Sequence, residues 1–90
     1  MEMIEEYKIL GWADVKNIVE KEAEKRIGGR IKKSWVDSIW LTPYIDGGKW
    51  IARLRIQVKK NIFKTKLYEV SAKINPLSEN IEEIEINEVR

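Results

Sequence analysis

The sequence predicts an α+β domain in which one N-terminal helix packs on a four-stranded antiparallel meander sheet. Three observations lead to this prediction. Apolar residues recur with helical spacing over residues 13–27, the period changes to two after the glycine pair that follows, and short turns separate four such segments. Residues 1–90 form one domain, because a chain of 90 residues buries a single thin core.

The segment ADVKNIVEKEAEKRI, residues 13–27, is expected to be an amphipathic helix. Its apolar side carries Val15, Ile18, Val19, Ala23 and Ile27. Asp14 is predicted as the N-cap, and Gly28 and Gly29 supply a residue that takes positive φ just past the last turn. Residues 1–11 leave three alternatives open: an extension of the helix, a short strand or a frayed end.

The first two strands are expected over residues 34–45 and 49–60. Pro43 indicates that the first strand lies at an edge or ends there, and the Asp-Gly pair in IDGGKW is typical of a hairpin turn. The second strand alternates, with Trp50, Ala52, Leu54, Ile56 and Val58 on one face and Ile51, Arg53, Arg55, Gln57 and Lys59 on the other. One face of the sheet is therefore expected to form the core and the other to face water.

The last two strands are expected over residues 64–75 and 81–89, joined by a turn in NPLSEN. Their core-facing residues are predicted to be Tyr68, Val70, Ala72 and Ile74 in the third strand and Ile84 and Ile86 in the fourth. The helix then lies across the face that these side chains form.

Strict alternation gives the first strand apolar residues on both faces. Trp35, Ile39 and Leu41 would lie on one face, and Val36, Trp40 and Tyr44 on the other. One set cannot lie under the helix, so either a subunit partner on the outer sheet face or edge-to-edge pairing of this strand is expected to cover it. The predicted partner-binding residues are Trp35, Ile39, Trp40 and Tyr44, and the expected partner is a second copy of the chain or another protein.

Residues 47–66 hold seven Lys or Arg and no Asp or Glu, in a chain of net charge +2. The alternative function is therefore nucleic-acid binding through this basic strand, with phosphates on Arg53, Arg55, Lys59, Lys60, Lys64 and Lys66 and bases stacked on a neighbouring aromatic ring. The competing interpretation is that Glu69 and the later glutamates Glu83, Glu85 and Glu88 neutralise the strand through cross-strand pairs. Both interpretations remain open at this point.

The composition argues against enzymatic activity. The chain has no Cys and no His, so it lacks a thiolate nucleophile, a zinc site of the cysteine type and the usual general base. Glutamate groups such as Glu82 with Glu83, or Glu20, Glu22 and Glu24, flank apolar positions and are expected to face solvent. We expect no enzyme, no cofactor and no metal.

The start of the chain, MEMIEEYKIL, carries acids where a secretory signal has bases, and no apolar core segment follows. With 36% charged residues, the composition is too polar for a membrane span. A cytoplasmic location without membrane contact is expected. Many Ile, Lys and Glu residues and the lack of Cys are typical of thermophile proteins.

The second half of the chain resembles the core of the gas vesicle protein O family. Gly48 and Trp50 open a strand, the segment Tyr68-Glu69-Val70 lies in the next strand, and the chain closes on a strand ending at Arg90. The Tyr-Glu-Val strand, its turn and the strand after it are also similar to cystatin-like and peptidase-propeptide-like domains. The resemblance implies a helix with an antiparallel sheet, and an accessory or assembly role without catalytic residues.

Overall fold

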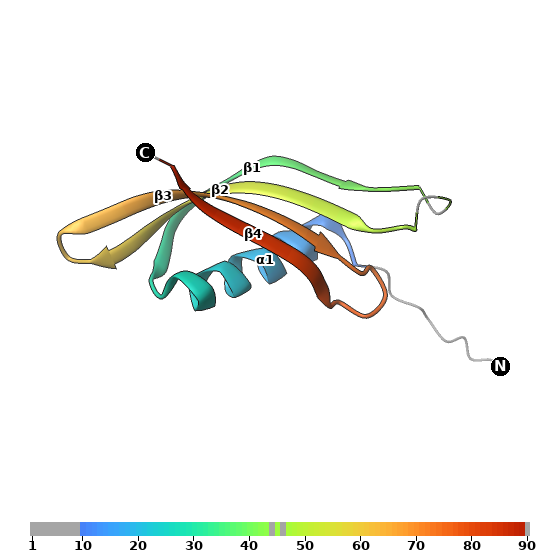
Figure 1. The fold of residues 1–90 in the computed structure, drawn as a ribbon, viewed down its shortest axis with the longest axis horizontal. Coiled ribbons are helices and arrows are strands. Elements are labelled where there is room, and N and C mark those ends of the chain that lie inside the picture. Colours follow the sequence, from blue (N-terminus) through green and yellow to red (C-terminus); the bar gives the residue numbers. More distant parts are fainter. Residues whose placement is uncertain (1–9, 44, 46, 90) are drawn as a thin grey trace.

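The structure is a computed structural model that describes residues 10–43, 45 and 47–89. Its elements are helix α1 (Trp12–Ile27) and strands β1 (Arg30–Leu41), β2 (Trp50–Asn61), β3 (Lys64–Ile74) and β4 (Ile81–Val89). The strands pair antiparallel in the order β1-β2-β3-β4, and α1 lies against one face of the twisted sheet (Figure 1). The predicted α+β meander is confirmed.

Helix α1 begins one residue earlier than predicted, and its N-cap is Gly11, so the prediction of Asp14 as N-cap is wrong. Asp14 lies one turn inside the helix, where its Oδ2 accepts a hydrogen bond of 3.1 Å from the Gly11 N–H. The carboxylate thus satisfies the amide that precedes the helix and complements the positive end of the helix dipole. Residues 1–9, for which three alternatives were open, lie outside the described residues.

The glycine pair ends the helix as predicted and also explains an early start of β1. Gly28 is the C-cap, with φ of 82°, and its N–H donates to the Glu24 carbonyl at 2.8 Å. A Cβ on Gly29 would lie only 2.9 Å from the Lys59 carbonyl oxygen, so only glycine lets the chain pass this close to β2. Pairing therefore begins at Arg30, four residues before the predicted strand, and β1 ends at Leu41, before Pro43.

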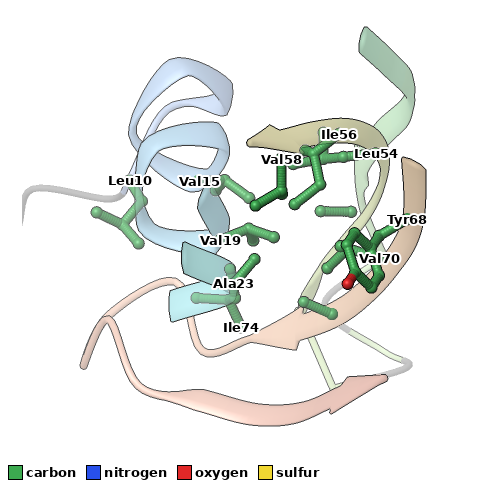
Figure 2. Packing of buried hydrophobic residues seen from close by; sticks show 12 residues of the cluster. Leu10, Val15, Val19, Ala23, Leu54, Ile56, Val58, Tyr68, Val70 and Ile74 are labelled. Atoms are coloured by element: carbon green, nitrogen blue, oxygen red, sulfur yellow. The ribbon is translucent and has the colours of Figure 1, made fainter. Parts of the chain in front are cut away.

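The core lies between α1 and the inner face of the sheet. The helix contributes Val15, Val19 and Ala23, all fully buried. Their partners from the sheet are Ala52, Leu54, Ile56, Val58, Tyr68, Val70, Ala72 and Ile74, and Leu10 lies at one end of the cluster (Figure 2). The predicted inner faces of β2 and β3 are thus confirmed, whereas Ile84 and Ile86 of β4 are only half-buried.

Leu10, just before the helix, is hydrogen-bonded to the end of the sheet where β2 begins and β3 ends. The Leu10 N–H donates to the Pro76 carbonyl at 3.3 Å, and the Leu10 carbonyl accepts from Trp50 Nε1 at 3.0 Å.

Within the described ranges there is no helix with the length and apolar character that a membrane span requires.

Candidate interaction surface on the outer sheet face

The outer face is the side of the sheet turned away from α1, and no element of the described chain covers it (Figure 1). The strand register aligns its side chains in four rows that run from β1 to β4. The rows are Lys33, Gln57, Leu67 and Val89; Trp35, Arg55, Glu69 and Asn87; Ser38, Arg53, Ser71 and Glu85; and Trp40, Ile51, Lys73 and Glu83.

A bulge in β1 brings the two tryptophans of this strand to the same face. The register shifts between Val36 and Ser38, so Asp37 is an extra residue without an opposite partner on β2. Alternation alone placed Trp35 and Trp40 on opposite faces, and that assignment is wrong. Both indoles lie on the outer face, with 44% and 45% of their surfaces exposed.

The same bulge turns Ile39 toward the helix side of the sheet. Ile39 lies opposite buried Ala52 and packs against the core cluster. It is therefore not part of the outer face, and its prediction as a partner contact rested on a strand without a bulge. Tyr44, the fourth predicted contact, lies outside the described residues.

Three of the six basic residues proposed for nucleic-acid binding lie on the outer face. Arg53, Arg55 and Lys59 follow one another there along β2, as the alternation predicted. Arg53 is flanked by two serines, Ser38 and Ser71, and is exposed.

The other three basic residues are held elsewhere. Lys60 donates from Nζ to the Ile27 carbonyl at 2.8 Å, at the end of the helix. Lys66 lies opposite buried Val58, on the helix side of the sheet. Lys64 opens β3 at the hairpin turn. The six residues therefore do not form one continuous binding row.

The charge of the basic strand is partly neutralised within the molecule. Arg55 pairs with Asp37, whose Oδ1 accepts from Nε at 3.2 Å and from Nη2 at 3.0 Å. Glu69 lies opposite Arg55 on the neighbouring strand, but Asp37 and not the predicted Glu69 makes the ion pair with Arg55. Sequence reasoning missed Asp37 because a bulge decides where its side chain points.

One of the β4 glutamates predicted to neutralise the basic strand, Glu88, pairs with a lysine of residues 47–66, whereas the partner of Glu83 lies outside that stretch. Glu88 pairs with Lys66 at 3.5 Å and Glu83 with Lys73 at 3.8 Å. Such exposed pairs contribute little to stability, typically about 0–1 kcal/mol each.

Glu82 forms a further ion pair with Lys49, at the start of the basic stretch. The hydrogen bond from the Lys49 ammonium group lowers the pKa of the Glu82 carboxyl below its usual value. Since protonation breaks this interaction, the small stabilisation that it provides is present above the unfolded-state pKa and disappears as the pH falls through the lowered value.

A shallow hollow of about 550 Å³ lies on the outer face and spans β2, β3 and β4. It forms over Ser71, whose side chain is small, and its walls come from β2 and β4. The lining side chains on this face are Ile51, Arg53, Ser71, Lys73, Glu83 and Glu85. Two carboxylates, Glu83 and Glu85, and two cations, Arg53 and Lys73, line it, and Glu83 pairs with Lys73.

The glutamates of α1 have structural partners. Glu20 pairs with Lys16 at 2.7 Å, Glu22 pairs with Arg26 at 2.8 Å, and Glu24 accepts from the Ile31 N–H at 2.8 Å. Among the residues that the structure describes, no three acidic side chains gather closely enough to hold a metal ion.

The outer face is thus an uncovered surface with two half-exposed tryptophans beside a row of arginines, and with carboxylates on its other half. Comparison of the chain with models of protein families, with curated proteins and with solved structures finds no match.

Proposed function

We propose that this chain is a non-catalytic interaction or assembly module of the cytoplasm, which binds a protein surface through the outer face of its sheet. The observation that carries the proposal is the pair Trp35 and Trp40 on this face, brought together by the β1 bulge and each almost half exposed. Arg53 and Arg55 lie beside them on β2. Tryptophan and arginine are the residue types that most often dominate the energy of protein interfaces.

The face of the sheet is a better binding surface than the edge of β1. Two register shifts interrupt the pairing of β1 with β2, one after Ile31 and one after Val36. Bulges twist an edge strand away from a flat, regular geometry and so discourage pairing with a strand of another molecule. The bulges do not hinder contacts through Trp35 and Trp40, because these side chains project from the face of the sheet and not from the edge of β1.

The runner-up function is binding of single-stranded nucleic acid on the same face. One observation favours it: Trp35 lies directly opposite Arg55, so a base stacked on the indole would have a guanidinium beside it. Three carboxylates on the other half of the face, those of Glu69, Glu83 and Glu85, oppose it because they repel phosphates. The protein-binding function is therefore preferred.

Light scattering on a sizing column, at low and moderate salt and with or without a mixed-sequence oligonucleotide, separates these functions. We expect a mass above that of the monomer that persists at moderate salt and does not change with the oligonucleotide, since the indoles supply an apolar contact that salt does not screen. A monomer that gains mass with the oligonucleotide only at low salt would support nucleic-acid binding instead. A monomer in every condition would overturn self-association.

A further inference from the structure

The outer face divides into a basic half and an acidic half. On β1 and β2 the charged residues are five bases, Arg30, Lys33, Arg53, Arg55 and Lys59, and one acid, Asp37. On β3 and β4 they are three acids, Glu69, Glu83 and Glu85, and one base, Lys73. A surface divided in this way is complementary to itself in some orientations and repels itself in others.

Two simple two-fold arrangements stack a second copy on this face. An axis perpendicular to the strands places β1 over β1 and therefore sets the basic half against another basic half. An axis parallel to the strands, along the boundary between β2 and β3, places β1 over β4 and β2 over β3. Only the second arrangement sets opposite charges against each other, and the penalty for facing like charges is large.

We infer that the partner of the outer face is a second copy of this chain, stacked face to face about a two-fold axis that runs parallel to the strands along the β2–β3 boundary. This inference rests on the proposed function, since it names the partner for the same surface. Two sheets packed in this way lie about 10 Å apart with their strands nearly aligned. Each side chain therefore meets the matching row of the other copy.

The two copies are most complementary in this arrangement along one row, that of Ser38, Arg53, Ser71 and Glu85. Arg53 of one copy lies over Ser71 of the other, where the small side chain leaves the hollow described above. The guanidinium then enters a depression whose far wall carries Glu85 and Glu83, the second of which also pairs with Lys73. The two-fold axis repeats the contact, so two arginines each meet carboxylates of the other copy.

The other rows agree with the same axis. Arg55 of one copy lies over Glu69 of the other, which gives a third kind of contact between opposite charges. Trp35 and Trp40 lie over β4, opposite Asn87 and Glu83, so both indoles are covered. The arrangement therefore accounts for the exposed tryptophans and for the division of charge together.

Two single charge reversals, Arg53→Glu and Glu85→Arg, test this orientation. Among the residues described, neither side chain makes an ion pair within the chain, so the reversals break no internal salt bridge. Each variant alone is expected to self-associate about 10-fold or more weakly than the unchanged chain, because like charges then meet at both symmetric contacts. Sedimentation velocity at low salt measures the change.

An equimolar mixture of the two variants is expected to recover association. In the mixed pair each glutamate at position 53 or 85 meets an arginine of the other chain, at both contacts. Effects within one chain are unchanged by mixing, so recovery reports the contact between copies. Equal thermal unfolding midpoints for both variants and the unchanged chain verify that the fold is intact.

Two results would overturn the inference while leaving the proposed function intact. In the first, both charge-reversal variants self-associate as tightly as the unchanged chain. In the second, each variant alone associates weakly and the equimolar mixture does not recover association. An unchanged chain that is monomeric at every concentration would instead overturn the inference and limit the proposed function to binding a different protein.

Discussion

Leu54→Ala is expected to lower the free energy of unfolding by about 2–5 kcal/mol, the range for truncating a large buried aliphatic side chain. Leu54 is 1% exposed and lies between Val36 and Val70 of the neighbouring strands, in the cluster that packs against α1. A thin core in a chain of 90 residues has few other side chains to fill the cavity. Urea denaturation followed by circular dichroism measures the loss.

Ile62→Ala is the matched control for this prediction. Ile62 is 77% exposed in the turn between β2 and β3, so truncation there is expected to change stability by less than about 0.5 kcal/mol. Similar losses for both variants would mean that Leu54 is not at the centre of the core.

The double variant Trp35→Lys with Trp40→Lys is expected to weaken self-association about 100-fold or more. Both indoles lie on the outer face beside Arg53 and Arg55 and are covered by β4 of the other copy, and truncation of a tryptophan that acts as a hot spot costs about 2 kcal/mol or more. The added ammonium groups also bring charge into a contact that must lose its water. The dissociation constant is measured by sedimentation equilibrium.

Trp12→Lys is the control, because Trp12 is a more exposed tryptophan on α1, away from the outer face. Its indole is 60% exposed, so its replacement removes one exposed indole and adds the same ammonium group without touching β1. We expect association to be unchanged. Equal weakening by Trp12→Lys and by the double variant would place the contact surface on the helix side of the molecule instead.

Most of the fold is predictable from the sequence because its signals are local. The 3.6-residue period of residues 13–27, the positive φ of Gly28 and the alternation in β2 and β3 each depend on a few neighbouring residues. The bounds of β4 were predicted as they are observed, since the turn before it holds Asn75, whose Oδ1 accepts from two following N–H groups.

The composition of the candidate surface was only partly predictable, because it depends on the register of β1. A single extra residue, Asp37, exchanges the faces of everything that follows it in the strand. The bulge moves Trp40 to the outer face and Ile39 to the core side, and it gives Arg55 an ion-pair partner from β1. No local pattern in SWVDSIWL distinguishes this bulged strand from a regular one.

The direct measurement of the central claim is the concentration dependence of the four indole N–H signals in an NMR spectrum of the unchanged chain. Trp35 and Trp40 lie on the outer face, Trp12 lies on α1, and the Trp50 indole is bonded to the Leu10 carbonyl. We predict that the signals of Trp35 and Trp40 shift as concentration rises, while those of Trp12 and Trp50 do not. Shifts confined to Trp12, or four signals that stay constant while the mass increases, would contradict binding through the outer face.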